Sequence, residues 1–337
     1  MNTLWLVYAA FACIISFLIT FYLVPILSAV AFKLNILDNP DGNLKQHKKA
    51  TPYLGGVAVY VGFITALALT FPFESQMFLM FIGSTLLLFV GLLDDLVPMK
   101  PYQKFFGQMV AAFCFLKGGF YLKELFLFSS HSPWAIIFWM FISFGWILSV
   151  INAFNLIDVM DGLATTTAIC ATTTFMALAY AFNLPLLLLL LCAFLGALFG
   201  FLRFNYPPAS IYLGDAGSLF IGGFLGIVPF MFPWGTYQVY GFVTPILVLL
   251  IPLLEVGTLI LIRTYRGIPF YNGSPDHFSI YLRKKGWSIK QVLAFVVALS
   301  LLLLSLSFAF SLGKVSFLIM LFISIGIVLG WYLVVLP

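Results

Sequence analysis

Long apolar segments recur along the whole chain and constrain its fold more than any other feature. A helix needs about 20 consecutive apolar residues to cross a bilayer. Hydrophobic residues make up 63% of the 337 residues and charged residues only 8%, which leaves too little polar surface for a soluble domain. The sequence therefore predicts an all-α polytopic membrane protein, a single integral-membrane domain over 1–337 with ten or eleven transmembrane helices. The eleven candidate spans cover residues 4–32, 53–71, 76–93, 102–117, 133–151, 162–181, 185–202, 217–232, 240–262, 290–311 and 315–335.

The basic residues divide unequally between the loops. When each loop is numbered by the span before it, the odd loops hold 13 Lys and Arg residues and the even loops hold 3. Because cytoplasmic loops are rich in Lys and Arg, we expect the odd loops and the C-terminus to be cytoplasmic and the N-terminus to lie outside. Topology also accounts for the net charge of +5 without a nucleic-acid partner. The first apolar run has no small-residue cleavage pattern, so we expect it to remain as a span.

The acidic residues gather on the same predicted face. Eight of the eleven Asp and Glu residues fall in odd loops or at their edges. Acidic residues contribute little to membrane orientation. Their position therefore favours a cytoplasm-facing site that holds an anionic ligand through a metal ion.

Residues 152–162 place two amides and two carboxylates between long apolar runs. On a helix, Asn155 and Asp158 share a face, and Asp161 is rotated part of the way round. Such a group could bind a divalent cation or a polar ligand. Equally, Asp161 or Gly162 could cap the following helix. These residues alone leave both interpretations open.

Three further loops carry candidate chemistry. The adjacent carboxylates of Asp94 and Asp95 raise each other's pKa, which suits a proton acceptor or a metal ligand, although solvated loop acids are the alternative. Asp215 follows Gly214 and could hold Mg²⁺ beside a phosphate or simply cap the next span. The loop 263–290 carries six basic residues, as expected for a lid over a nucleotide diphosphate. Glu255 lies inside a predicted span, either as a partner of another span or at the border of the cytoplasmic cavity.

Taken in order, the motifs at 94–95, 152–162 and 214–218 resemble those of the polyprenyl-phosphate N-acetylhexosamine-1-phosphate transferases. This membrane family includes the muramyl-pentapeptide translocase, and the resemblance covers essentially the whole chain. It implies transfer of a sugar-1-phosphate from a UDP-sugar to a polyprenyl (undecaprenyl) phosphate, with release of UMP. It also implies a Mg²⁺ cofactor that Mn²⁺ could replace, and an active site on the cytoplasmic face of the inner (plasma) membrane. The product would start lipopolysaccharide or teichoic acid synthesis.

The same resemblance assigns roles to individual residues. Asp215 and Asn155 would bind the metal, and the Tyr212 ring would stack on uracil. Whether Asp94 deprotonates the lipid phosphate or an aspartate attacks first, in a covalent two-step route, stays open. The residues assigned to catalysis are Asp94, Asp95, Lys104 and His277; those assigned to substrate binding are Lys49, Lys100, Asn152, Asp158, Asp161, Tyr212, Arg266 and Asp276.

Two departures from the family pattern bear on the donor sugar. The loop around His277 keeps one histidine, with Ser279 and Ile280 where more would be expected, and Val159 replaces a glycine. Residues 38–40 and His47 look more like the UDP-N-acetylglucosamine group. The expected donor is therefore a UDP-N-acetylhexosamine, most of all UDP-N-acetylglucosamine.

Two alternatives remain at this stage. One is the phospho-MurNAc-pentapeptide translocase, although its triple-histidine motif is absent. The other is a secondary transporter, which would place ionisable groups near the bilayer midplane; only Glu255 lies well inside a span. Dimerisation is common in the family, so a homodimer is a further expectation.

Overall fold

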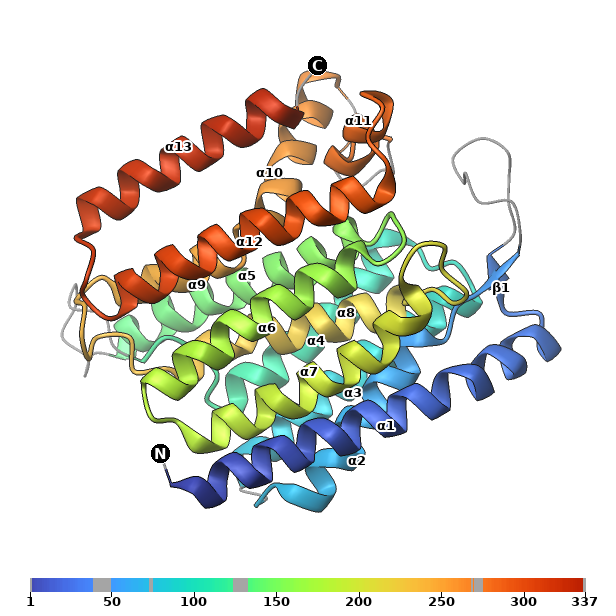
Figure 1. Cartoon of the computed structure of the whole chain (residues 1–337), viewed down its shortest axis with the longest axis horizontal. Helices are drawn as coiled ribbons and strands as arrows, with labels where there is room; N and C mark the ends of the chain where they lie inside the picture. Colours follow the sequence, from blue (N-terminus) through green and yellow to red (C-terminus); the bar gives the residue numbers. More distant parts are fainter. Residues whose placement is uncertain are drawn as a thin grey trace.

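The computed structural model is a bundle of helices (Figure 1) and describes residues 2–38, 50–72, 75–123, 133–267, 269 and 275–335. Two short strands, β1 (Leu37–Asp38) and β2 (Thr51–Pro52), pair antiparallel. The helices are α1 (Thr3–Lys33), α2 (Gly55–Thr70), α3 (Ser75–Leu96), α4 (Pro101–Lys117), α5 (Pro133–Ile157), α6 (Leu163–Ala181), α7 (Pro185–Asn205), α8 (Gly214–Ile227), η1 (Val228–Met231), η2 (Gly241–Val243), α9 (Thr244–Val248), α10 (Leu250–Tyr265), α11 (Phe278–Lys284), α12 (Ile289–Ser311) and α13 (Phe317–Val335).

The all-α, multi-pass character predicted from the sequence is confirmed, but the number of spans is not. Within the described residues, eight helices are long and apolar enough to cross a membrane, or nine if one bent pair counts as a span. The predicted spans at 53–71 and 102–117 correspond to α2 and α4, which have only 16 and 17 residues. The predicted orientation in the membrane stays a prediction.

The predicted span 240–262 is broken in the structure. It consists of η2 and α9, followed by α10 at an angle of 71°. Pro252 explains the position of the break. In a continuous helix its ring would clash with the carbonyl of Val248, the last residue of α9, and it has no N–H to donate to that carbonyl.

Helix α8 lies at the centre of the bundle. It packs against α2, α3 and α5, and its residues from 216 to 227 are all buried. Its Phe224 ring lies 5.0 Å from the Phe63 ring of α2 and 4.4 Å from the Phe194 ring of α7, centroid to centroid. Such aromatic pairs contribute about 0.5–1.5 kcal/mol beyond the area they bury. The centre of the bundle thus holds α8 as a fixed element.

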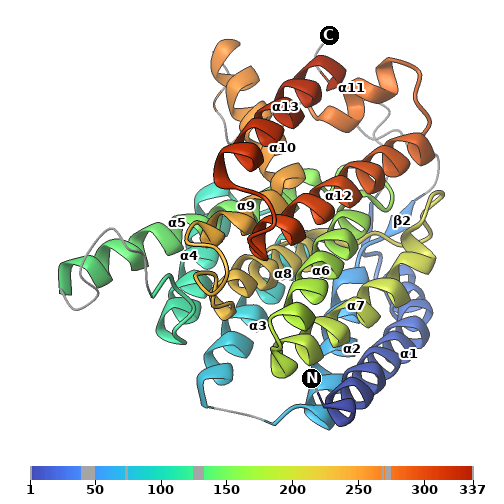
Figure 2. The same ribbon diagram turned by 60° about the vertical axis from the view of Figure 1, so that its left-hand side comes forward.

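The outer helices expose large apolar side chains. Phe141 on α5 is 72% exposed, and Phe322 and Leu333 on α13 are 79% and 83% exposed. Helices α10 and α12 cover α5 and α6 on the side away from α1 and α2, and α11 and α13 pack beyond them (Figures 1 and 2). An apolar surface of this extent is suited to contact with lipid rather than water.

Gly91 allows the end of α3 to approach the start of α8. A Cβ atom at this position would overlap the backbone of Asp215 and Ala216. This close approach places the last turn of α3, which carries Asp94 and Asp95, directly against the first turn of α8.

We therefore expect Gly91→Ala to lower the melting temperature of the purified protein in detergent. Overpacking a tight contact costs about 1–3 kcal/mol, more than the gain of about 0.5–1 kcal/mol from replacing a helical glycine. Gly326→Ala in α13 is the matched control, because a Cβ there meets no atom within 4 Å. Equal melting temperatures for the two variants would contradict the account of this contact.

Candidate active site

Four helices meet around the ammonium group of Lys104. The nitrogen Nζ, which comes from the first turns of α4, lies 2.5 Å from Oδ2 of Asp215 at the start of α8. It also lies 3.0 Å from Oδ2 of Asp94 at the end of α3 and 3.1 Å from Oδ1 of Asn155 near the end of α5. Four residues near the predicted cytoplasmic ends of four helices therefore come together. We call them the Lys104 cluster: Asp94, Lys104, Asn155 and Asp215.

Asn155 also holds the second oxygen of Asp215. Its Nδ2 donates to Oδ1 of Asp215 at 2.6 Å and to Oγ of Ser218 at 3.0 Å. Ser218 belongs to the motif 214–218 but had no role of its own among the predicted site residues; it lies three residues after Asp215 and hence on the same helix face. Both oxygens of Asp215 and the amide of Asn155 are thus fixed in orientation.

Asp95 caps α8 from a different helix. Its Oδ1 accepts a hydrogen bond from the Asp215 N–H at 2.8 Å, and its Oδ2 accepts one from the Ala216 N–H at 3.0 Å. Gly214 makes room for this carboxylate, since it has a φ of +72° and a Cβ would lie 2.6 Å from Oδ2 of Asp95. Asp215 therefore does not cap α8, as one interpretation of the sequence held; Asp95 does. The catalytic role predicted for Asp95 stays a prediction.

Asp94 fixes the turn between α3 and α4. Its Oδ1 accepts a hydrogen bond from the Met99 N–H at 2.7 Å, while Oδ2 faces Lys104. Its position thus depends on the backbone of the turn as well as on the lysine.

The loop after α5 is tied to the loop before α8. Oδ2 of Asp161 accepts a hydrogen bond from the Ala209 N–H at 3.0 Å. The N-cap of α6 is Gly162, with a φ of +72°, and its N–H donates to Oδ1 of Asn205 at 3.1 Å. Of the two capping candidates in the sequence, Gly162 is therefore the capping residue, and Asp161 holds the neighbouring loop.

Asp158 lies in a strongly acidic environment. Burial raises the pKa of its carboxyl well above the usual value, and the carboxylates of Asp215, Asp95 and Asp161 raise it further. Burial also raises the pKa of the Tyr212 hydroxyl, to which the charges of Asp161 and Asp158 contribute. The predicted donor-site residues therefore share one electrostatic neighbourhood with the Lys104 cluster.

A second polar network joins α10 to α11. The fully buried Glu255 lies 2.7 Å from Nδ1 of His277 through Oε1, and its Oε2 accepts a hydrogen bond from the Phe278 N–H at 3.2 Å. Oδ1 of Asp276 accepts hydrogen bonds from Arg266 at 2.6 Å and from the Tyr281 hydroxyl at 2.9 Å. Glu255 thus pairs with His277 and Phe278, which follow α10 in the chain. Its charge inside a predicted span had indicated that it would have such a partner.

Two further predicted substrate-binding residues contact other side chains, and a third lies outside the described residues. The Lys100 ammonium lies 6.0 Å from the centroid of the Tyr102 ring. Nδ2 of Asn152 donates to Oε1 of Gln108 at 2.9 Å, which links α5 to α4. Lys49 lies outside the described residues.

The donor atoms of the Lys104 cluster fit a hard cation. In the described part of the chain, no group of three or more His, Cys, Asp or Glu side chains is arranged to hold a metal ion. Three side-chain oxygens, from Asp94, Asn155 and Asp215, nevertheless surround the Lys104 ammonium. Mg²⁺ commonly binds through one or two carboxylates and takes its remaining ligands from water and substrate phosphates. The oxygen donors are therefore suitable for Mg²⁺ if the ligand supplies the remainder.

The raised pKa of Asp158 predicts a stability effect that depends on pH. Between the unfolded pKa of about 3.9 and the raised folded pKa, the folded state binds more protons, so the carboxyl lowers stability as pH rises through this range. We expect Asp158→Asn to raise the melting temperature at pH 8 in the presence of chelator, and the gain to shrink towards pH 4.5. A gain independent of pH, or a lower melting temperature at pH 8, would contradict this assignment.

Comparison with known proteins places these residues in a family. Residues 77–232, which include all four residues of the Lys104 cluster, match Glycosyl transferase family 4. A protein of Bacillus subtilis (strain 168), described as a probable undecaprenyl-phosphate N-acetylglucosaminyl 1-phosphate transferase, is 28% identical over 85% of this chain and 80% of its own length. A phospho-N-acetylmuramoyl-pentapeptide-transferase of Streptococcus pneumoniae (strain 70585) is 30% identical over 64% of this chain and 71% of its own length. The chain therefore belongs to glycosyl transferase family 4, the polyprenyl-phosphate N-acetylhexosamine-1-phosphate transferases.

Proposed function

We propose that this protein transfers N-acetylglucosamine-1-phosphate from UDP-N-acetylglucosamine to undecaprenyl phosphate. The reaction would release UMP and leave a lipid-linked pyrophosphate sugar from which a cell-envelope polysaccharide is built. The name of the Bacillus subtilis relative supports the acceptor and the sugar. The observation that carries the proposal is the convergence of Asp94, Asn155 and Asp215 on Lys104.

In this reaction an oxygen of the acceptor phosphate attacks the phosphorus that is bonded to the sugar. The new phosphorus–oxygen bond forms as the bond to the bridging oxygen of UDP breaks, and UMP leaves with that oxygen. Catalysis of phosphoryl transfer rests mainly on positioning and on stabilising charge. The Lys104 ammonium supplies a positive charge where two carboxylates and an incoming phosphate would otherwise repel one another.

The balance of charge in the site supports a divalent cation. The carboxylates of Asp94 and Asp215 face one lysine and Asp95 lies beside them on the α8 backbone, whereas both proposed substrates carry phosphate. We assign Mg²⁺ to Asp215 and Asn155, with the diphosphate of the donor as a further ligand, and Mn²⁺ as a replacement. When bound, the ion would neutralise charge that develops on the phosphate oxygens.

The loop 158–162 and Tyr212 are the proposed donor side of the site. The Tyr212 ring lies 6.4 Å from the Tyr53 ring, at an interplanar angle of 51°. An aromatic surface beside polar groups suits a uracil ring, which can stack and form hydrogen bonds. Arg266, held by Asp276, is assigned to substrate binding, and His277, held by Glu255, to catalysis.

The remaining assignments follow the sequence. The positive-inside pattern supports a site that faces the cytoplasm in the inner (plasma) membrane. A homodimer also belongs to this proposal. The relatives are named as transferases, which favours the enzyme over the transporter.

The test is UMP release by the full-length protein in detergent with UDP-N-acetylglucosamine, undecaprenyl phosphate and Mg²⁺. We expect release that stops with chelator and resumes when Mg²⁺ or Mn²⁺ is restored. Asp215→Asn should lower the rate by at least about 100-fold, the typical cost of removing one group that stabilises transition-state charge. Silence of the folded wild-type protein with every UDP-sugar would overturn the proposal.

The second candidate is the phospho-N-acetylmuramoyl-pentapeptide transferase, because relatives of that name match 64% of this chain or more. The choice of donor distinguishes the two. Turnover of UDP-N-acetylmuramoyl-pentapeptide without turnover of UDP-N-acetylglucosamine would establish the second function.

Lys104 and Lys117, at opposite ends of α4, form a matched pair for the role of the ammonium. We expect Lys104→Met to lower the rate of UMP release by about 100-fold or more, because it removes the positive charge from the cluster. Lys117, whose ammonium lies 5.6 Å from the Phe113 ring centroid, contacts none of the cluster residues, so Lys117→Met should retain activity. Equal rates in the two variants would exclude the assigned role of Lys104.

A further inference from the structure

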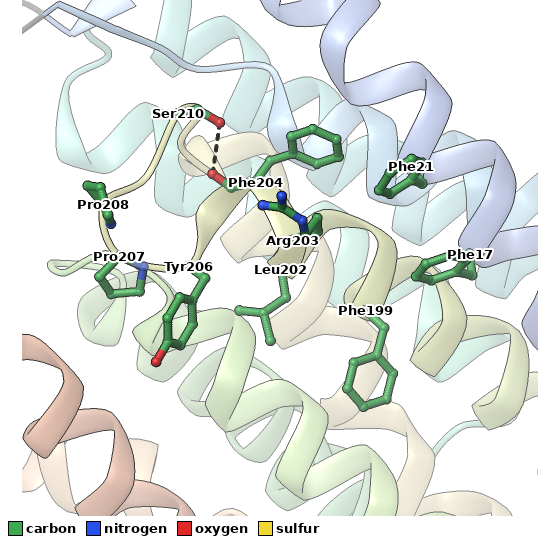
Figure 3. Close-up of a pocket in the computed structure, with 10 residues that line it drawn as sticks. All are labelled: Phe17, Phe21, Phe199, Leu202, Arg203, Phe204, Tyr206, Pro207, Pro208 and Ser210. Carbon is green, nitrogen blue, oxygen red and sulfur yellow. Dashed lines mark hydrogen bonds between the residues drawn. The ribbon is translucent and has the colours of Figure 1, made fainter.

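A groove lies between α1 and α7 (Figure 3), and none of its lining residues belongs to the Lys104 cluster. Its volume is about 920 Å³. Phe17 and Phe21 of α1 form one wall, and Phe199 and Leu202 of α7 form another. The turn from Tyr206 to Ser210 closes one end, and the lining is otherwise apolar except for Arg203.

The groove opens onto the outer surface of the bundle, where some of its lining side chains are exposed. Phe199 is 44% exposed and Tyr206 is 46% exposed. The exposed side chains of α1 nearby are apolar as well, with Leu18 at 43% and Tyr22 at 66%. In a membrane, this surface would face acyl chains.

Positive charge gathers at the end of the groove formed by the turn. Arg203 belongs to the last turn of α7 and is exposed; within the described residues it forms no ion pair. The Lys290 ammonium lies 5.9 Å from the centroid of the Tyr206 ring, so a second cation stands beside the lining. Among the described residues no Asp or Glu lines the groove, and the Asp161 carboxylate accepts a hydrogen bond from the Ala209 N–H of the turn.

We propose that this groove binds one anionic phospholipid, with an acyl chain between α1 and α7 and the phosphate beside Arg203. A long apolar slot with a cation at one end matches an amphipathic molecule that has a negative head and a hydrocarbon tail. Arginine side chains at the ends of spans extend towards the interface, where anionic headgroups attract them. Guanidinium also pairs well with phosphate in geometry and charge.

The occupant is a phospholipid rather than the polyprenyl acceptor. None of the lining residues belongs to the Lys104 cluster, where the acceptor phosphate would react. The volume also falls within the range of about 300–1,000 Å³ that encloses a molecule of drug size. This space suits one acyl chain better than a polyprenyl chain of many isoprene units.

A lipid at this position would support the turn that holds Asp161. The Ala209 N–H, which lies between the lining residues Pro208 and Ser210, donates to Asp161. The turn from Tyr206 to Ser210 therefore contacts both the groove and the loop 158–162.

Native mass spectrometry of the full-length protein in detergent tests the proposal. The probes are dioleoyl phosphatidylglycerol and dioleoyl phosphatidylcholine, which share acyl chains and differ in net charge. We expect the first bound lipid to show a preference of about tenfold for phosphatidylglycerol, because the cations Arg203 and Lys290 attract its net negative headgroup and repel the choline ammonium of phosphatidylcholine. Arg203→Gln should reduce this preference to within about twofold.

Two further variants separate the groove from general surface charge. Lys314→Gln removes an exposed cation elsewhere on the chain and should keep the preference. Leu202→Trp fills the groove and should weaken phosphatidylglycerol binding although Arg203 is intact. Melting temperatures close to wild type would show that the variants are folded.

Three results would overturn the proposal. One is a wild-type protein without a preference between the two lipids. Another is a preference that Arg203→Gln leaves unchanged, or that Lys314→Gln removes to the same extent. The third is undecaprenyl phosphate that displaces phosphatidylglycerol from the first site in a manner that depends on Arg203, which would identify the groove as an acceptor site.

Discussion

The arrangement of the site depends on the Lys104 ammonium. It lies within hydrogen-bonding distance of Asp94, Asn155 and Asp215, which belong to three other helices. Two carboxylates so close together in a partly buried place would repel each other, and burial without a partner would be costly. Through Lys104, the N-terminal end of α4 thus contacts the C-terminal ends of α3 and α5 and the N-terminal end of α8. Two carboxylates on one ammonium leave a net negative charge in the cluster, which supports the proposal of a further cation beside a phosphate ligand.

Hydrogen bonds from its own backbone N–H groups to Asp95 also hold the first turn of α8 in place. Asp95 binds the N–H groups of Asp215 and Ala216, and Gly91 and Gly214 leave room for this contact. The N-terminal end of a helix carries a partial positive charge and free N–H groups. Asp95 occupies those groups from α3, so the Asp215 side chain, rather than the helix end, faces the site. Two neighbouring aspartates therefore have different surroundings, one in contact with lysine and one with backbone.

Much of the helical framework follows from the lengths of the apolar runs. The boundaries expected for 4–32, 290–311 and 315–335 agree closely with α1, α12 and α13, because each run ends at charged or turn-forming residues. The expected count of ten or eleven spans is not confirmed, because α2 and α4 have only 16 and 17 residues and the predicted span that contains Pro252 is bent. Convergence of Asp94, Asn155 and Asp215 was foreseeable, because all three lie at span ends on one predicted face and fit the family pattern.

The contacts between distant segments were not foreseeable from one sequence. Asp95 accepts a hydrogen bond from a backbone N–H 120 residues further along the chain, and Asn152 donates one to Gln108 of another helix. The rotation of each helix about its axis decides such pairs. Here that rotation depends on close packing at small residues such as Gly91, which a hydropathy pattern does not reveal.

The location of the metal ion tests the central claim most directly. A structure determined with Mn²⁺ and UDP-N-acetylglucosamine, in which anomalous scattering locates the ion, would show which side chains bind it. We predict one ion at about 2.1 Å from a carboxylate oxygen of Asp215, with Asn155 beside it and the Lys104 ammonium moved towards the phosphates. An ion bound by Asp158 and Asp161 instead, or a bound donor with no metal near Asp215, would contradict it.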